Sequence, residues 1–198
     1  MQPQSSHHTQ EACPLCGEEF GTVTLRGGRR VRIRGLCPGD KEKLLRFYNS
    51  LSEETIYTRF FAVVRYFDPY IERLLSDRCT LVIVAEDLET GDIVGMAESF
   101  VDEKTGAAEG GIIVREDYQG HGLGSALARV MISVLKLAGV RKLYGYVLSD
   151  NQRAITLARK LGARTLREQP GLVRVEVDVE AAARRIAPST GEKRRGER

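Results

Sequence analysis

The sequence EGGIIVREDYQGHGLGS occupies residues 109–125 and decides how the rest of the chain is interpreted. Branched apolar residues at 112–114 favour a buried strand. Beyond the glycines, apolar residues recur at helical spacing from Leu123 to Leu137, so a helix is expected to begin there. Glycines at 120, 122 and 124 leave backbone N–H groups uncovered where the dipole of that helix is positive. The strand, glycine turn and helix together predict a site for a phosphate or pyrophosphate group.

Two common phosphate-binding loops do not fit this spacing. A P-loop ends in Gly-Lys-Ser/Thr, whereas here Gly124 is followed by Ser125 and an alanine. A Rossmann loop needs Gly-x-Gly-x-x-Gly, which the three glycines do not match. The spacing Gln119-x-x-Gly122-x-Gly124, behind a strand that carries Glu109, instead resembles the acetyl-CoA signature of the GNAT family of N-acetyltransferases.

The resemblance implies an α/β (α+β) GNAT fold. Its sheet is expected to be mixed, mainly antiparallel and six- to seven-stranded, with helices on both faces and splayed central parallel strands. The pantetheine arm of the co-substrate, acetyl-CoA, is expected in the gap between those strands. Gly110 and Gly111 permit a bulge or a close ligand approach there. The residues that the resemblance assigns to acetyl-CoA are Ile112, Ile113, Val114, Gln119, Gly120, His121, Gly122, Leu123, Gly124, Ser125 and Asn151.

Two further stretches carry the resemblance. Asn151-x-x-Ala154, followed by Leu161-Gly162-Ala163, is similar to the second motif of the family. Many members have a tyrosine at the position of Ala158, where it protonates the leaving thiolate; the alanine leaves the general acid unassigned. Residues 44–61, LLRFYNSLSEETIYTRFF, resemble the opening helices of bacterial protein lysine acetyltransferases that modify acyl-CoA synthetases.

The reaction requires a general base. A lysine has a pKa of about 10.4 in water and must lose a proton to attack a thioester. Glu109 matches the strand glutamate that serves as base in many members of the family, and we predict that role for it. Glu98 on the preceding strand is the reserve candidate, and Glu116 and Asp117 are expected on a solvated loop.

Length and composition limit the number of domains, the classes of partner and the expected location of the protein. The 198 residues are enough for one packed domain, and 42% hydrophobic with 29% charged residues is ordinary for a soluble protein. A net charge of +3 gives no argument for nucleic acid. No apolar run approaches the length of a membrane span, so no membrane partner is expected. Four scattered cysteines favour reduced thiols and a cytoplasmic location.

The chain divides into three expected parts. Residues 1–29 are predicted as a flexible leader with a Cys-x-x-Cys motif, residues 30–180 as the acetyltransferase domain, and residues 181–198 as a basic tail. We predict no metal site. The alternative is zinc held by Cys13 and Cys16, with Cys37 as a third ligand only if the leader folds back.

Three functions stay open at this point. The first is acetylation of a protein lysine, with an acyl-CoA synthetase as acceptor, by direct attack in a ternary complex. The second is acetylation of a small amine by the same fold. The third is a non-catalytic module that senses acetyl-CoA. The oligomeric state and the preferred acyl chain do not follow from the sequence.

Overall fold

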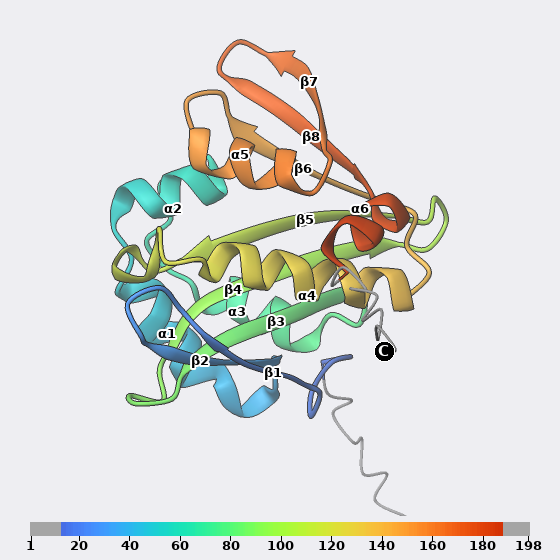
Figure 1. Cartoon of the computed structure of the whole chain (residues 1–198). Coiled ribbons are helices and arrows are strands. Elements are labelled where there is room, and N and C mark those ends of the chain that lie inside the picture. The colour runs from blue at the N-terminus through green and yellow to red at the C-terminus, as the bar shows by residue number, and fades with distance from the viewer. Residues whose placement is uncertain (1–12, 188–198) are drawn as a thin grey trace, which may run out of the picture.

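The computed structural model describes residues 13–187, apart from the side chain at position 167. Within that range eight strands form one sheet in the order β1-β2-β3-β4-β5-β6-β8-β7 (Figure 1). The strands are β1 (Glu19–Thr24), β2 (Arg30–Gly35), β3 (Thr80–Asp87), β4 (Ile93–Asp102), β5 (Ala107–Val114), β6 (Lys142–Leu148), β7 (Arg164–Gln169) and β8 (Leu172–Asp178). The predicted GNAT fold is confirmed, with a sheet one or two strands larger than expected.

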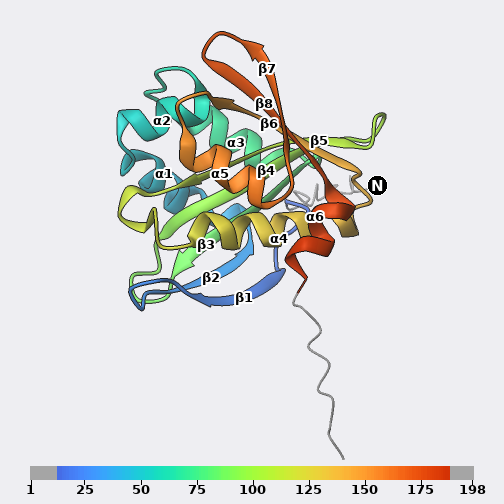
Figure 2. The same ribbon diagram turned by 45° about the horizontal axis from the view of Figure 1, so that its top comes forward.

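One pair of neighbouring strands is parallel, and it is the pair that separates. All other neighbours in the described sheet run antiparallel, whereas β5 and β6 are parallel and pair only from Ala107 with Lys142 to Glu109 with Tyr144. Both strands continue well beyond that point. Figures 1 and 2 show β6, β8 and β7 leaning away from β5. The predicted splay of the central parallel strands is therefore present.

Helices cover both faces of the sheet. One face carries α1 (Lys41–Asn49), α2 (Glu53–Phe60) and α3 (Asp68–Ser76); the other carries α4 (Leu123–Leu137), α5 (Gln152–Lys160) and α6 (Val179–Ile186). Short 3₁₀ turns, η1 (Pro38–Asp40) and η2 (Glu116–Tyr118), precede α1 and the glycine loop. The α1 side is packed with aromatic rings; Tyr48 stacks on Phe67 at 4.5 Å between ring centroids. No helix among residues 13–187 is long and apolar enough to cross a membrane.

Two parts of the expected domain division need correction. Residues 13–29 are not a flexible leader, because β1 pairs with β2 along its length and Phe20 and Val23 pack against the core. Residues 181–186 are not a solvated tail either: they complete α6, in which Ala182 is fully buried. Both segments are short, so their few apolar residues do not form a recognisable pattern in the sequence. Their burial follows from packing against the sheet and α4.

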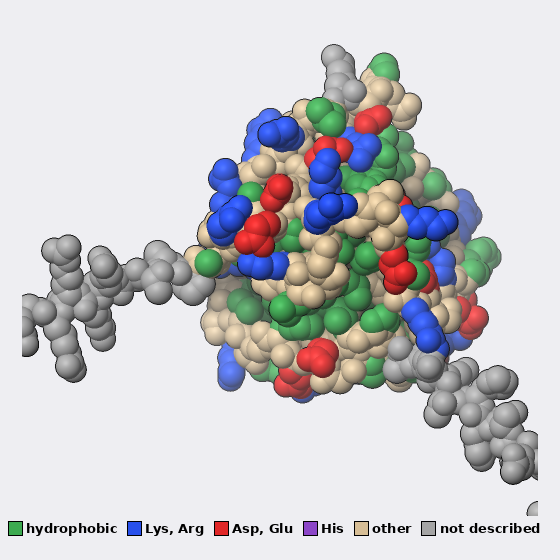
Figure 3. Space-filling view, turned by 90° about the vertical axis from the view of Figure 1, so that its right-hand side faces the viewer, with side chains coloured by type: hydrophobic (Ala, Val, Ile, Leu, Met, Phe, Trp, Pro, Cys, Tyr) green, Lys and Arg blue, Asp and Glu red, His purple; other side chains and the backbone are tan. Residues whose placement is uncertain are grey.

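The charged side chains show no single-sign field on the face where α4 ends and α6 begins. Figure 3 shows basic and acidic side chains interspersed there, with hydrophobic side chains between them. An apolar groove of about 530 Å³ on this side is lined by β1, α4 and α6. This mixed surface agrees with the low net charge of the sequence.

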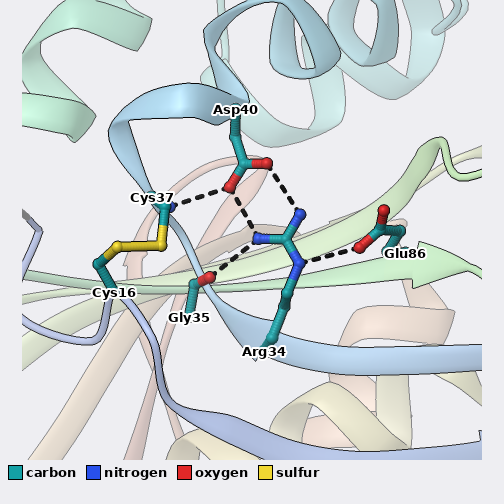
Figure 4. The surroundings of a disulfide bond; sticks show 6 residues. All are labelled: Cys16, Arg34, Gly35, Cys37, Asp40 and Glu86. Carbon is teal, nitrogen blue, oxygen red and sulfur yellow. Dashed lines mark hydrogen bonds and ion pairs between the residues drawn. A yellow bond between two sulfur atoms is a disulfide. The ribbon is translucent and has the colours of Figure 1, made fainter.

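A disulfide joins the amino-terminal segment to the residue that precedes η1. Cys16 and Cys37 are bonded, with their Cα atoms 4.7 Å apart, so the expectation of a reduced thiol at Cys16 is corrected (Figure 4). Strand β1 folds back along β2 and brings the two residues within the distance that a disulfide needs. Cys13 is a buried free cysteine, and burial raises the pKa of its thiol.

Beside the disulfide lies a buried network of ion pairs. The Arg34 guanidinium donates to both carboxylate oxygens of Asp40, at 2.7 and 2.8 Å, and through Nε to Glu86 at 2.9 Å (Figure 4). Asp40 also accepts from the backbone N–H of Cys37 at 2.9 Å. Glu86 accepts further bonds from Arg32 and Lys43. This network connects β2, β3 and the start of α1.

The network predicts a loss of stability in acid. Burial raises the pKa of Glu86, but hydrogen bonds from Lys43, Arg32 and Arg34 outweigh it and lower the pKa to about 2. Because the folded pKa lies below the unfolded value, Glu86 contributes fully above about pH 4.5, and this contribution is lost as the pH falls toward 2. The contribution is about 3 kcal/mol. Urea unfolding between pH 5 and 2.5 should show a steeper fall for the native protein than for Glu86→Gln; equal slopes contradict the assignment.

Candidate active site

The gap between β5 and β6 begins immediately after Glu109 and Tyr144. A side chain at Gly145 would place its Cβ 2.7 Å from the carbonyl oxygen of Gly110, so only glycine allows the two backbones to lie this close where pairing ends. Beyond this point the edge of β5 that faces β6 has no strand partner within the described sheet. Its free backbone groups can pair with a ligand that has its own amides.

The two glycines of β5 do not form a bulge. Strand β5 pairs with β4 without a register shift, so that possibility from the sequence is wrong. A Cβ at Gly110 would lie 2.8 Å from Ser99 Oγ, and a Cβ at Gly111 would lie 2.6 Å from the Cζ atom of Arg59. Gly110 therefore leaves room for Ser99 and Leu143 on one face of the sheet, and Gly111 leaves room for Arg59 on the other.

The glycine loop has the geometry of an anion site. Gly120 and Gly122 have φ angles of +78° and +99°, the left-handed region that favours glycine. Gly122 is the N-cap of α4, and among residues 13–187 no side chain caps this end. A Cβ built at either glycine meets no atom within 4 Å. The first amides of α4 are thus uncapped and accessible at the positive end of a fifteen-residue helix.

Gln119 links the glycine loop to three other elements. Its Nε2 donates to the Val114 carbonyl at 2.9 Å and lies 3.4 Å from Thr55 Oγ1 on α2, while its Oε1 accepts from Arg153 on α5 at 2.7 Å. Arg153 was not identified from sequence; its only signal is a basic residue in the first turn of α5. Gln119 therefore lies at the end of β5, between this strand, α2 and α5.

Asn151 begins α5. Its Oδ1 accepts from the backbone N–H of Ala154 at 3.1 Å, so the side chain is an N-cap. Its predicted contact with acetyl-CoA stays a prediction. Ala158 is buried in the same helix, and the phenol found there in many family members has no counterpart at this position.

His121 contacts the β1–β2 hairpin. Its Nδ1–H donates to the Arg26 carbonyl at 2.7 Å, and the Arg26 N–H donates back to the His121 carbonyl at 3.1 Å. The Arg26 guanidinium also bonds to the carbonyl of Gly120. This pairing could not be inferred from the sequence, because 95 residues separate the two partners. The β1–β2 hairpin thus contacts the glycine loop through Arg26, which bonds to both Gly120 and His121.

Removing the imidazole should therefore weaken acetyl-CoA binding without stopping the reaction. His121→Ala deletes one hydrogen bond to Arg26, a loss of about 1 kcal/mol or about fivefold in Kd. Isothermal titration calorimetry measures Kd, and kcat should stay within about twofold of the native value. Thr22→Ala, at an exposed position on β1, is the control. A Kd unchanged in His121→Ala contradicts a bracing role.

Both candidate bases lie on the face of the sheet that α2 covers. Glu109 is exposed and lies between Phe100 on β4 and Tyr144 on β6. No ion pair holds its carboxylate among the described residues. Glu98, in contrast, has a side chain 13% exposed, pairs with Arg59 and accepts a hydrogen bond from the Tyr70 hydroxyl. Glu109 is thus free to accept a proton, whereas both oxygens of Glu98 are occupied.

The acids after β5 have structural partners. Glu116 and Asp117 are exposed on η2, as expected. Glu116 accepts from the backbone N–H of Ser52 at 2.8 Å, next to the start of α2. Asp117 pairs with Arg115 and Arg29. Neither is placed to serve as the base.

Comparison with known proteins fits this geometry. Residues 44–163 match the model of the acetyltransferase (GNAT) family, a span that includes the glycine loop, the splayed strands, most of α1, and α2 to α5. The chain belongs to the GNAT family. Members of this family use acetyl-CoA, and the uncapped helix end and open β5 edge fit its phosphates and its pantetheine amides.

Two individual acetyltransferases are similar to this chain in sequence. The chain is 34% identical over 163 residues to Acetyltransferase Pat of Mycolicibacterium smegmatis, covering 79% of this chain and 48% of that protein. It is 31% identical over 144 residues to an acetyltransferase of Pseudomonas aeruginosa, covering 70% of this chain and 77% of the relative. The chain thus spans about half the length of Acetyltransferase Pat.

Solved structures agree. The GNAT domain of S. lividans PAT superposes with a TM-score of 0.74 at 27% identity, covering 81% of this chain and 96% of that domain. A variant of a cAMP-binding acyltransferase from Mycobacterium smegmatis gives a TM-score of 0.56 at 26% identity, over 83% of this chain and 53% of that one. The chain is therefore a member of the GNAT family and is related to Pat.

Proposed function

We propose that this protein transfers an acetyl group from acetyl-CoA to a lysine side chain of a protein, with an acyl-CoA synthetase as the expected acceptor. The observation that carries the proposal is the position of residues 44–61. This stretch resembles the opening helices of protein lysine acetyltransferases, and it forms α1 and α2. Helix α2 places Arg59 against β5, two residues from Glu109 on the same face. Residues 44–61, which carry this resemblance, therefore pack beside Glu109, and we infer that the acceptor approaches on this side.

The chain's own residues suit acetyl-CoA as co-substrate. The first amides of α4, from Gly122 to Ser125, would hold the pyrophosphate, and the open edge of β5 at residues 112–114 would pair with the pantetheine arm. When bound, acetyl-CoA supplies an activated thioester. We include Gln119 and Asn151 among the residues that shape this site.

Glu109 is the proposed general base. The acceptor amine forms a bond to the acetyl carbon, the carbon–sulfur bond breaks, and its electron pair stays on sulfur. The proton of the attacking amine passes to Glu109, directly or through a water. The transfer is direct, in a ternary complex, and forms no acyl-enzyme. We also infer a cytoplasmic location, where acetyl-CoA and acyl-CoA synthetases are found together.

The test is acetylation of a purified acyl-CoA synthetase, followed by mass spectrometry. The chain and acetyl-CoA should add one acetyl group to a lysine of the synthetase, and heat-inactivated chain should add none. A panel of polyamines, aminoglycosides and amino acids is assayed in parallel by thiol release. Turnover on a small amine alone would replace the proposal with the small-molecule function. Binding of acetyl-CoA without any turnover would indicate a sensor.

A further inference from the structure

We propose that Arg59 is a positioning residue of the acetyl transfer: it neutralises Glu98, so that Glu109 alone faces the acceptor amine as an unpaired carboxylate. The proposal rests on the function proposed above, because it assigns a residue to the same reaction. It arises from a contact that connects α2, β4 and β5 beside the gap.

The first observation is the position of the guanidinium on the sheet. Cζ, Nε and Nη2 of Arg59 lie 2.6 to 2.7 Å from the position that a Cβ of Gly111 would occupy. The guanidinium therefore lies directly on the backbone of β5, where this strand has just lost its pairing with β6. Gly111 is needed at this position because any side chain would displace the arginine.

The second observation is that Glu98 has no remaining role as a base. It lies directly opposite Gly111 in the β4–β5 register, one oxygen accepts from Arg59 Nη2, and the other accepts from the Tyr70 hydroxyl. Burial and the charge of Glu98 raise the pKa of Tyr70 well above its usual value, so its hydroxyl stays a donor. Arg59 and Glu98 thus form a neutral pair with side chains only 22% and 13% exposed.

The third observation is that Glu109 lies within the field of this pair. Burial lowers the pKa of Arg59, but the nearby charges of Glu98 and Glu109 outweigh it and raise the value. Every element around Glu109 contributes charged or titratable groups to the same face. Besides Arg59, Glu98 and Tyr70, they are Asp102 on β4, Lys142, Tyr144 and Tyr146 on β6, and Arg174, Glu176 and Asp178 on β8.

Loss of the arginine should therefore act on the base through charge. With Arg59 replaced by glutamine, Glu98 becomes an uncompensated negative charge close to Glu109, and like charges disfavour ionisation. The acidic limb of the kcat/KM profile should then move to higher pH. Removing Glu98 as well restores a neutral pair of side chains. If Arg59 acted only by packing, its loss could lower kcat/KM but would not shift the acidic limb of the pH profile.

The experiment measures pH profiles of kcat/KM for the full chain and four variants, with urea unfolding of each as a check of folding. Arg59→Gln should move the acidic limb up by about one pH unit, which lowers kcat/KM by up to about tenfold at pH values on that limb. Arg59→Lys keeps the charge, so its limb should stay within about 0.3 of a pH unit of the native position. The double variant Arg59→Gln/Glu98→Gln should return the limb to the native position. Arg129→Gln, at an exposed position on α4, should leave the profile unchanged.

An acidic limb that stays in place in Arg59→Gln would overturn the proposal, as would a double variant no closer to the native profile than the single one. If Arg59→Gln does not fold, Gly111→Ala takes its place, because the added Cβ displaces the guanidinium while the charge remains; a native kcat/KM in that variant would also overturn it. Native chain that acetylates a small amine and no synthetase would refute the protein substrate only. The Arg59 comparison is then made on that amine.

Discussion

Glu109→Gln is expected to lower kcat by a factor of about 10² to 10⁴ at pH 7, the contribution of a positioned general base. Glutamine has nearly the same shape as glutamate but cannot accept the proton of the attacking amine. The KM for acetyl-CoA should change little, because the glycine loop and the β5 edge are untouched. Thiol release under saturating acetyl-CoA and acceptor measures kcat directly.

The pH dependence separates loss of the base from a general disturbance. In the native chain the rate should level off once Glu109 is ionised, whereas in the variant it should keep rising with pH as more of the amine becomes neutral. Glu103→Gln, in the exposed turn between β4 and β5, is the matched control and should retain native kcat. A Glu109→Gln variant with more than a tenth of native kcat would refute the assignment of the base.

Arg34→Met should have the largest effect on stability, a loss of about 3–5 kcal/mol in the free energy of unfolding. The arginine bridges Asp40 and Glu86, whose side chains are only 8% and 7% exposed. Methionine fills similar space but leaves Asp40 as a buried carboxylate without its cationic partner. Glu86 keeps Arg32 and Lys43, so the cost arises mainly at Asp40.

Urea unfolding at pH 7 measures this loss as a lower midpoint at an unchanged m-value. Arg30→Met, at an exposed position on the same strand, should change stability by no more than about 0.5 kcal/mol. A loss below about 1 kcal/mol in Arg34→Met would show that solvent compensates Asp40, and the network would then be a surface ion pair in energetic terms.

Local signals in the sequence account for the strand, glycine loop and helix of residues 109–137. Branched residues, glycines at positive φ and a helical repeat act within a few residues of one another, so they predict β5, the loop and α4 without knowledge of the rest. Ser52 is a further local case: its hydroxyl oxygen accepts from the backbone N–H of Thr55, three residues on, and so caps the start of α2.

Contacts between residues far apart in the sequence could not be predicted from such local signals. Strand β1 has few buried residues of its own and becomes a strand only by pairing with β2, which also brings Cys16 to Cys37. The contact of His121 with Arg26 and that of Arg59 with Glu98 each join distant positions. Neither leaves a periodic mark in the sequence, because hydrogen bonds and ion pairs have no preferred sequence separation.

By itself, then, the sequence determined the family and predicted the anion site at the start of α4 and the candidate base, because these depend on residue types at fixed short spacings. Only the tertiary structure decided which of two glutamates is free. Glu98 and Glu109 lie on neighbouring strands, and the family resemblance favours Glu109, but the sequence does not show which side chains each carboxylate meets. Arg59 and Tyr70, brought from α2 and α3, occupy Glu98 and leave Glu109 unpaired, since packing against the sheet sets which carboxylate meets a partner.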